Sequence, residues 1–300
     1  MKYPRWLPLA GMPVLLIAVQ VVALLLSPTF ASTGTVAFED PSSVANPFIF
    51  IGILLVFTAF LLILIRLGVK KILTFIIGFS IFLTFLYIFL SVSIVFFGES
   101  DLGGILAIGA TILATLVLYK YPEWYVVDSL GVLIAAGAAS IFGISLQIFP
   151  VLILLVLLAV YDAISVYKTK HMITLAENVV ETRAPILFVI PKKRSFSYVN
   201  EGISFGGEER GAFLMGMGDL IMPTILVVSS HAFITAPGIA GISIPTLGAI
   251  AGSLLGLGIL ILVVSKGKPQ AGLPPLNAGT ILGFLVGCAL VGAWAWIPAL

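Results

Sequence analysis

Long uninterrupted runs of apolar residues constrain this chain more than any other feature. A helix needs roughly 20 apolar residues to cross about 30 Å of hydrocarbon, where every backbone polar group must be hydrogen-bonded within the protein. Of the 300 residues, 60% are hydrophobic and only 9% are charged, and the mean hydropathy is +1.22. These values exclude a soluble globular protein and predict an all-α, polytopic membrane protein.

Nine runs are long enough to span a membrane, and polar or proline-containing breaks separate them. The predicted spans are residues 8–27, 47–67, 72–97, 102–118, 124–143, 147–167, 211–231, 238–264 and 276–297. The first run also resembles a secretory signal, because Lys2 and Arg5 precede it and the small residues Ala31 and Ser32 follow it. A permanent span is the preferred interpretation.

The positive charges predict how the chain is oriented in the membrane. Alternating the connections across nine spans places all 15 Lys and Arg residues on one side. The opposite side carries the acidic residues Glu39, Asp40, Glu99 and Asp101. By the positive-inside rule, the N-terminus is cytoplasmic and the C-terminus extracytoplasmic, in a cell membrane or an endomembrane.

The charge balance and the cysteine content exclude several kinds of function. The 15 Lys and Arg residues against 13 Asp and Glu residues leave a net charge of +2, which gives no field for holding nucleic acid. The one cysteine, Cys288, excludes an intramolecular disulfide and a cysteine-cluster metal site. The chain shows no cofactor-binding loop, so neither a cofactor nor a metal is expected, and the lipid bilayer is the first partner implied.

One long polar connection divides the spans into six and three. We expect a six-helix N-terminal part (1–167), a cytoplasmic loop (168–210) and a three-helix C-terminal part (211–300). Within the loop, residues 171–183 have the pattern of an interfacial amphipathic helix, and residues 186–190 predict a short strand with no evident partner in the chain. That strand is either a buried anchor of the loop or an edge that awaits a peptide.

Glycines at four-residue spacing mark the last two spans. They are Gly248, Gly252 and Gly256 in the eighth and Gly279, Gly283 and Gly287 in the ninth. Small residues on one face let two helix backbones approach closely in lipid. The pattern predicts close packing of these spans, which an enzyme, a transporter and a channel can all use.

Three acidic residues, Asp128, Asp162 and Asp219, lie inside predicted spans. A charge at mid-helix costs roughly 2.5–3.5 kcal/mol on insertion scales, so each is a functional candidate. Counting ~1.5 Å per residue puts Asp162 ~9 Å and Asp219 ~13 Å inside the cytoplasmic ends of their spans, where the two carboxylates can meet. Asp128 lies near a span end, where an interfacial or locally hydrogen-bonded carboxylate is the simpler interpretation.

Two aspartates in a low-dielectric site cannot both ionise easily, so they share a proton. The arrangement suits peptide hydrolysis, because one carboxylate activates water while the other protonates the carbonyl group. A proton-coupled transporter or a cation channel would use the same pair without proteolysis. A purely structural scaffold leaves the buried carboxylates unexplained.

The sequences around the two acids distinguish among these alternatives. Tyr161-Asp162 lies in the sixth span, Gly216-Met217-Gly218-Asp219-Leu220 in the seventh, and Pro274-Pro275-Leu276 opens the ninth. In these elements the chain resembles the presenilin and signal peptide peptidase family of GxGD intramembrane aspartyl proteases. The predicted cytoplasmic N-terminus resembles the presenilin branch.

The resemblance implies a role for each of these residues. Asp162 and Asp219 would be the catalytic pair, and the residues that shape the active site would be Tyr161, Gly216, Gly218, Leu220, Pro274, Pro275 and Leu276. The third element is Pro-Ala-Leu in the family, and Pro275 stands here for the alanine. Pro298-Ala299-Leu300 is a literal match but ends the chain on the opposite side, so residues 274–276 are preferred. Two successive prolines predict a rigid, extended segment.

The implied activity is hydrolysis of peptide bonds in or near the transmembrane helices of substrate proteins or peptides. The same resemblance implies that a substrate unwinds locally and presents an extended segment, which residues 186–190 would pair by edge addition. The chain has no sizeable docking domain, which favours activity without accessory subunits. A presenilin-like need for accessory proteins, cleavage of the 168–210 loop and a homo-oligomer all stay open.

Overall fold

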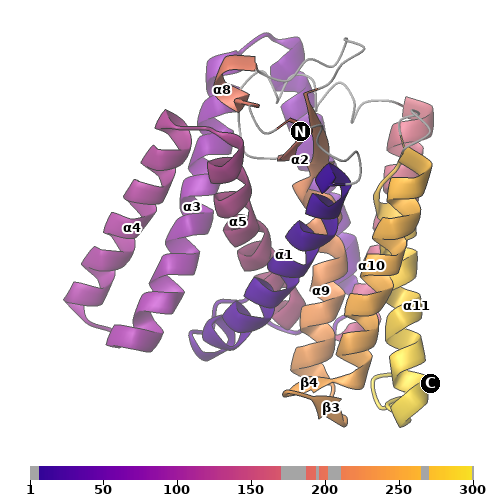
Figure 1. Cartoon of the computed structure of the whole chain (residues 1–300). Helices are drawn as coiled ribbons and strands as arrows, with labels where there is room; N and C mark the ends of the chain where they lie inside the picture. The colour runs from indigo at the N-terminus through magenta and orange to yellow at the C-terminus, as the bar shows by residue number, and fades with distance from the viewer. Residues whose placement is uncertain (1–6, 170–186, 194–195, 202–210, 265–269, 299–300) are drawn as a thin grey trace.

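The computed structural model consists mainly of long helices and describes residues 7–169, 187–193, 196–201, 211–264 and 270–298. The long helices are α1 (Leu7–Ser32), α2 (Ala45–Arg66), α3 (Lys70–Phe97), α4 (Asp101–Lys120), α5 (Trp124–Ser145), α6 (Ile148–Ile164), α9 (Met217–Phe233), α10 (Ile244–Val264) and α11 (Leu273–Val291). The shorter elements are the π-helix η1 (Ser165–Thr169), helix α8 (Tyr198–Glu201) and strands β1 (Leu187–Pro191), β2 (Ala212–Gly216), β3 (Gly238–Ile239) and β4 (Ile242–Ser243). Successive long helices run up and down, and the start of α1 and the end of α11 lie at opposite ends of the bundle (Figure 1).

Each of the nine predicted spans contains a long helix. In the described part of the chain, eight helices are long and apolar enough to cross a membrane, and α9 is a shorter apolar helix of 17 residues. The chain is therefore an all-α, multi-pass integral membrane protein. In α1, the side chains of Leu16, Val19, Ala23 and Phe30 are fully buried in the main core.

Short strands replace the beginnings of two predicted spans. Residues 212–216 form β2, and residues 238–243 form the β3–β4 hairpin, so α9 and α10 each begin about six residues later than predicted. The prediction was wrong here because a short apolar run fits a buried strand and a helix equally well. The helix predicted over residues 171–183 lies outside the residues that the structure describes.

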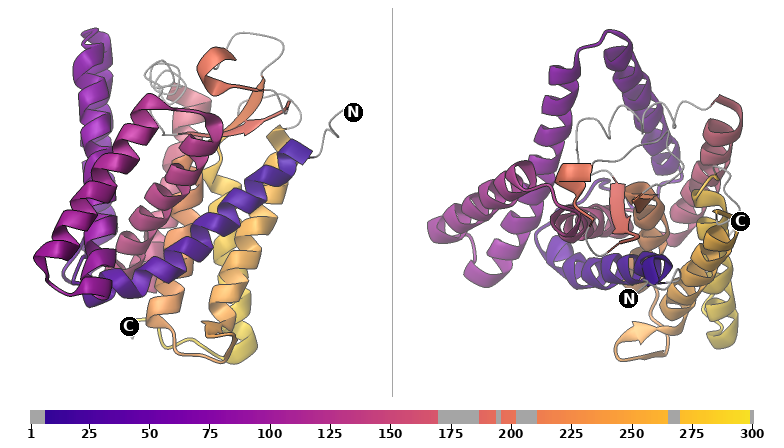
Figure 2. Two further views of the ribbon diagram at one scale, coloured as in Figure 1. Left: turned by 60° about the vertical axis from the view of Figure 1, so that its left-hand side comes forward. Right: turned by 45° about the horizontal axis from the view of Figure 1, so that its top comes forward.

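The strand predicted over residues 186–190 is confirmed, but it does have a partner in the chain. β1 pairs antiparallel with β2, and Leu187 lies opposite Gly216 while Pro191 lies opposite Ala212. The sequence did not reveal this partner because β2 was assigned to a span. Together with α8, the two strands form a cap over one end of the bundle (Figure 2).

Glycines bring α10 and α11 into backbone contact, as their spacing predicts. A Cβ atom added at Gly252 would overlap the carbonyl group of Gly279, and one added at Gly283 would overlap that of Gly248. Lipid gives helices no hydrophobic reason to associate, so close packing of this kind supplies much of the attraction. The contact fixes the position of α11, whose first turn reaches the candidate site.

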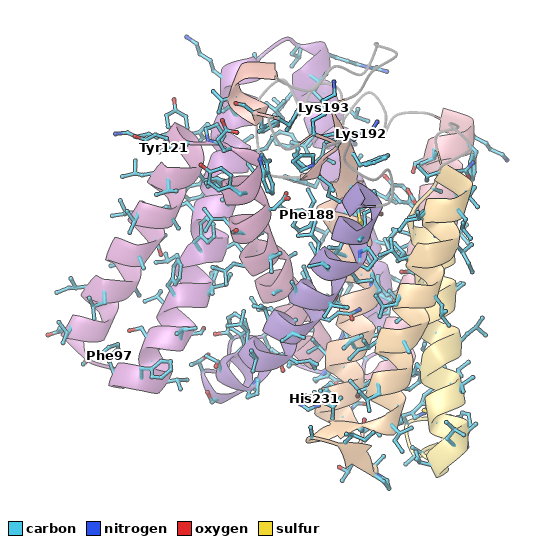
Figure 3. All side chains as sticks on the ribbon, in the orientation of Figure 1. Phe97, Tyr121, Phe188, Lys192, Lys193 and His231 are labelled. Atoms are coloured by element: carbon cyan, nitrogen blue, oxygen red, sulfur yellow. The ribbon has the colours of Figure 1, made fainter. Side chains whose placement is uncertain are left out.

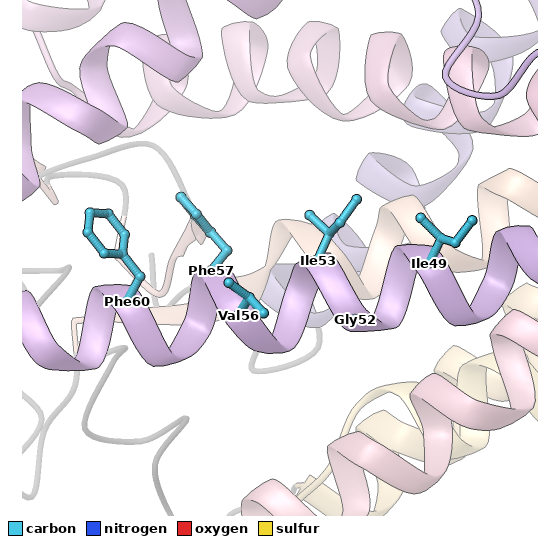
Figure 4. A pocket seen from close by; sticks show the side chains of 6 residues that line it. All are labelled: Ile49, Gly52, Ile53, Val56, Phe57 and Phe60. Carbon is cyan, nitrogen blue, oxygen red and sulfur yellow. The ribbon is translucent and has the colours of Figure 1, made fainter.

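The main core lies among α1, α5, α6, α9, α10 and α11. Lys192 and Lys193 mark one end of the bundle, and Phe97 and His231 mark the other (Figure 3). An open apolar hollow lies along α2, away from the core, and its lining residues are Ile49, Gly52, Ile53, Val56, Phe57 and Phe60 (Figure 4). This surface suits lipid chains and offers no group for chemistry.

Replacing Gly252 by alanine tests the contact between α10 and α11. We expect the substitution to destabilise the protein by about 1–3 kcal/mol, because the new methyl group meets backbone atoms that cannot rotate away. Gly258→Ala on the same helix is the matched control, since a Cβ atom there meets nothing within 4 Å. Thermal unfolding in detergent measures both, and equal melting temperatures would contradict the assignment.

Candidate active site

Asp162 lies near the C-terminal end of α6 and is 7% exposed. Its carboxylate atom Oδ2 accepts a hydrogen bond from the backbone N–H of Leu273, with an N···O distance of 3.0 Å. A second backbone hydrogen bond comes from Gly272. The acid therefore holds the N-terminus of α11, more than 100 residues away in the chain.

This contact explains the two prolines at the start of α11. The first N–H groups of a helix have no partner inside the helix. Here Gly272 and Leu273 donate to Asp162, while Pro274 and Pro275 have no N–H group to satisfy. The expectation of an extended segment was wrong, because both prolines lie in the first helical turn, where their fixed φ is compatible with the helix.

Asp219 lies in the first turn of α9, not well inside a span as its distance from Arg210 suggested. The intervening residues form β2, and Gly216 is both the last residue of β2 and the N-cap of α9. The Asp219 carboxylate is hydrogen-bonded to the backbone of Gly216. This is the return contact of a capping box, in which the third residue of a helix satisfies the N–H group of its cap.

Gly272 brings the two acids together. A Cβ atom at this position would lie 2.7–2.8 Å from three atoms of the Asp219 carboxyl group, closer than non-bonded atoms tolerate. The backbone of the same residue is hydrogen-bonded to Asp162. The carboxyl groups of Asp162 and Asp219 are near enough to interact electrostatically. The pair predicted from depth along two helices is thus one site.

Gly272 and Leu273 are site residues that sequence reasoning missed. Both act through the backbone, and a donating N–H group leaves no signature in a sequence. A second missed contact supports the same segment, because the Tyr167 hydroxyl donates to Oε1 of Gln270 at 2.7 Å and accepts from the N–H of Ala271 at 3.4 Å. The sequence signal that could have identified this segment was the glycine directly before Leu273-Pro274.

The other predicted site residues differ in exposure. Gly218 is exposed and a Cβ atom there would meet nothing within 4 Å, while Asp219 and Tyr161 are partly exposed. Leu220 and Leu276 are fully buried and pack in the main core. Pro274 and Pro275 are partly buried. The accessible side of the pair is therefore the α9 side, at Gly218. Of the alternative element Pro298-Ala299-Leu300, the last two residues lie outside the described residues.

Asp128 does not join the pair. It lies on α5, is 8% exposed, and its atom Oδ1 accepts a hydrogen bond of 2.8 Å from the backbone N–H of Val189 in β1. The expectation of an interfacial or locally hydrogen-bonded carboxylate was wrong, because Asp128 is buried and its hydrogen-bond donor lies 61 residues away.

The fold and the site together define a polytopic membrane protein with two neighbouring aspartates inside its helix bundle. Residues 13–293 match the profile of the family described as signal-peptide peptidase, presenilin aspartyl protease. The chain belongs to this family, and so to the intramembrane aspartate proteases.

Solved structures agree with this membership. The chain is similar to a presenilin family intramembrane aspartate protease crystallised in space group C222, with 51% identity over 95% of this chain and 100% of that one and a TM-score of 0.73. For the structure in space group P2, the identity is 53% over 96% of this chain and 100% of that one, with a TM-score of 0.72. A comparison with curated proteins gives no match.

Gly272→Ala tests the arrangement of the site. We expect the methyl group to displace the Asp219 carboxyl group and to lower kcat for cleavage of a transmembrane substrate by roughly 10²-fold, because misplacement by ~1 Å costs that much. Gly109→Ala on α4 is the control, since a Cβ atom there meets nothing within 4 Å. Wild-type kcat in the Gly272 variant would show that Asp219 lies elsewhere during the reaction.

Proposed function

We propose that Asp162 and Asp219 are the catalytic pair of an intramembrane endopeptidase that hydrolyses peptide bonds in or near substrate transmembrane helices. The observation that carries this proposal is the position of Gly272, which contacts both carboxyl groups. A helix end held between two acids suits a role in chemistry, because it fixes both acids against the same rigid backbone.

The reaction needs one proton shared between the two acids. The ionised carboxylate removes a proton from water, the oxygen of that water attacks the scissile carbonyl carbon, and the protonated acid gives its proton to the carbonyl oxygen. The C–N bond of the tetrahedral intermediate then breaks, and the amine leaves with the proton taken from water. The acid that gave its proton to the carbonyl oxygen takes a proton back from a hydroxyl group of the intermediate as the product carboxyl group forms. Both acids return to their starting states, so no cofactor or metal is required.

Access for water and substrate is proposed at Gly218. This residue is exposed and has no side chain, and it directly precedes Asp219. We place this end of the bundle on the cytoplasmic side, because Lys192 and Lys193 lie there (Figure 3) and belong to the connection predicted to be cytoplasmic. A site in the first turn of α9 then lies near the membrane surface, where water reaches it.

The β1–β2 sheet is the proposed guide for an extended substrate. The N–H group of Lys192 donates to the carbonyl of Gly211, which fixes the alternation of the ladder. The backbone N–H and C=O groups of residues 188 and 190 therefore point toward β2. Those of Val189 point to the outer edge of β1, and those of Leu214 point to the outer edge of β2. An added strand would bind at one of these two edges.

The β2 edge is the better candidate. On β1, the outward N–H group of Val189 is taken by Asp128, and Pro191 has none, which are two ways in which edge strands avoid pairing. On β2, no hydrogen bond within the described residues occupies the outward N–H group of Leu214. A peptide paired there would run toward Asp219, three residues beyond the end of β2. We therefore propose that substrate pairs with β2, and not with β1 as expected from the sequence.

Asp162→Asn and Asp219→Asn test the catalytic assignment. Each variant should lose at least about 10²-fold in cleavage of a single-span substrate by the purified protein, because proton transfer contributes that much. Asp101→Asn, at the exposed start of α4, should cleave like wild type. Undiminished product from either site variant contradicts the pair.

The same variants distinguish the protease from a channel or a proton-coupled transporter. Those functions predict ion flux that depends on the two acids and no cleavage by wild type. Membership of an aspartyl protease family favours hydrolysis.

Leu214→Pro tests the strand edge. The substitution removes one outward N–H group and leaves the ladder to β1 intact, because this N–H group does not face β1. We expect kcat/KM to fall roughly tenfold, the loss of one good hydrogen bond to substrate. Leu214→Val keeps the N–H group and should retain wild-type kcat/KM. Equal values for the two variants would exclude pairing at this edge.

A further inference from the structure

Asp128 is the third acid inside the bundle, and the proposed mechanism does not use it. It is buried on α5, and its carboxylate meets an N–H group on the outer edge of β1, at Val189. A backbone N–H group buried without an acceptor is destabilising. The acid thus satisfies a strand edge that water cannot reach and that a second strand would otherwise pair.

One turn further along α5, Gly131 packs against β1 and against the start of α9. A Cβ atom at Gly131 would lie 3.1 Å from the Phe188 ring and 2.6 Å from the end of Met217, so the missing side chain makes room for both. Phe188 itself is fully buried, and Figure 3 labels it below Lys192 and Lys193, toward the helices. One helix face therefore contacts both β1 and the first residue of α9.

A second carboxylate, at the N-terminus of α5, also accepts a hydrogen bond from a backbone N–H group. Glu123 precedes α5, and its atom Oε2 accepts a hydrogen bond of 3.0 Å from the N–H of Tyr198 at the start of α8. Its Oε1 accepts one of 2.7 Å from the Ser197 hydroxyl. Two acids, five residues apart, thus bind the chain on both sides of Lys192-Lys193.

The contacts of Asp128 are connected to Asp219 through the β1–β2 sheet. Val189 lies opposite Leu214, and β2 ends at Gly216, the residue that is hydrogen-bonded to Asp219. A movement of β1 on α5 would therefore move the β2 edge and Asp219 together. We propose that Asp128 is a positioning residue, which docks the β1–β2 sheet on α5, closes the β1 edge and sets the register in which an extended substrate passes Asp219.

The proposal rests on the proposed function for its consequence in catalysis, but its contact is testable without catalysis. Hydrogen–deuterium exchange at Val189 reports the bond directly in the full-length protein. Asp128→Ala should speed exchange there by about tenfold or more, because the amide loses its acceptor. Asp128→Asn keeps the accepting oxygen and should leave exchange within about twofold of wild type.

Activity measures whether the docking matters for the substrate. With a single-span substrate, Asp128→Ala should lower kcat/KM by roughly tenfold and spread cleavage over neighbouring peptide bonds, seen by mass spectrometry of the products. Asp128→Asn should restore both the rate and the main cleavage position. A variant that merely unfolds would lose rate without changing the cleavage position in the surviving fraction.

Val189→Pro approaches the same bond from the donor. It removes the N–H group that Asp128 accepts and no ladder hydrogen bond, since Val189 does not face β2. If the two groups act together, Val189→Pro with Asp128→Ala should shift the cleavage position no further than either single change. Asp101→Ala, at the exposed start of α4, is the control for removal of an acid.

Two results would overturn the proposal. One is slow, wild-type exchange at Val189 in Asp128→Ala, and the other is an unchanged cleavage position together with unchanged kcat/KM. If exchange responds as expected but wild type cleaves no substrate, the docking contact holds and the proposed function fails. If Asp162→Asn and Asp219→Asn are inactive while Asp128→Ala cleaves like wild type, the proposed function holds and the positioning role of Asp128 fails.

Discussion

The hydrogen bond from the N–H of Leu273 to Asp162 is the contact on which the candidate site depends. It joins the end of α6 to the beginning of α11, and it places Gly272 against the Asp219 carboxyl group. The glycine contact between α10 and α11 supports it from the other side, because α11 cannot shift along α10 without backbone overlap. The placement of the two acids therefore follows from how α6 ends and how α9 and α11 begin.

The burial of all three acids inside the bundle is compensated in the same way. Each is hydrogen-bonded to backbone from an element that follows it or precedes it in the chain: Asp128 to β1, Asp162 to the start of α11, and Asp219 to the end of β2. An unpaired carboxylate and an unpaired N–H group are both costly away from water. Strand edges and helix beginnings are where backbone N–H groups are left over. In this protein, the acids and those leftover donors satisfy each other, and the contacts assemble the site.

The long helices and the two site aspartates could be predicted from sequence, because a segment inside a membrane must be almost entirely apolar. The helices follow from the length of the apolar runs, and the two aspartates stood out because an acid in such a run is rare. The close packing of α10 and α11 followed from glycine spacing. What was missed shares a different physical basis. β2 was taken for the start of a span, the prolines of α11 were expected to be extended, and Gly272 and Leu273 were not identified. In each case backbone hydrogen bonds to distant residues decide the outcome, and side-chain patterns do not record them.

The sequence by itself determined that this is a membrane protein, which segments contain its long helices, and which acids are functional candidates, because hydrophobicity and charge act residue by residue. The tertiary structure decided that Asp162 and Asp219 belong to one site, that β1 has a partner, and that Asp128 belongs to the sheet and not to the pair. These decisions depend on contacts between residues 61 and 111 positions apart, such as Asp128 with Val189 and Asp162 with Leu273. Only the packed helices bring such residues within the 3 Å or so that a hydrogen bond allows.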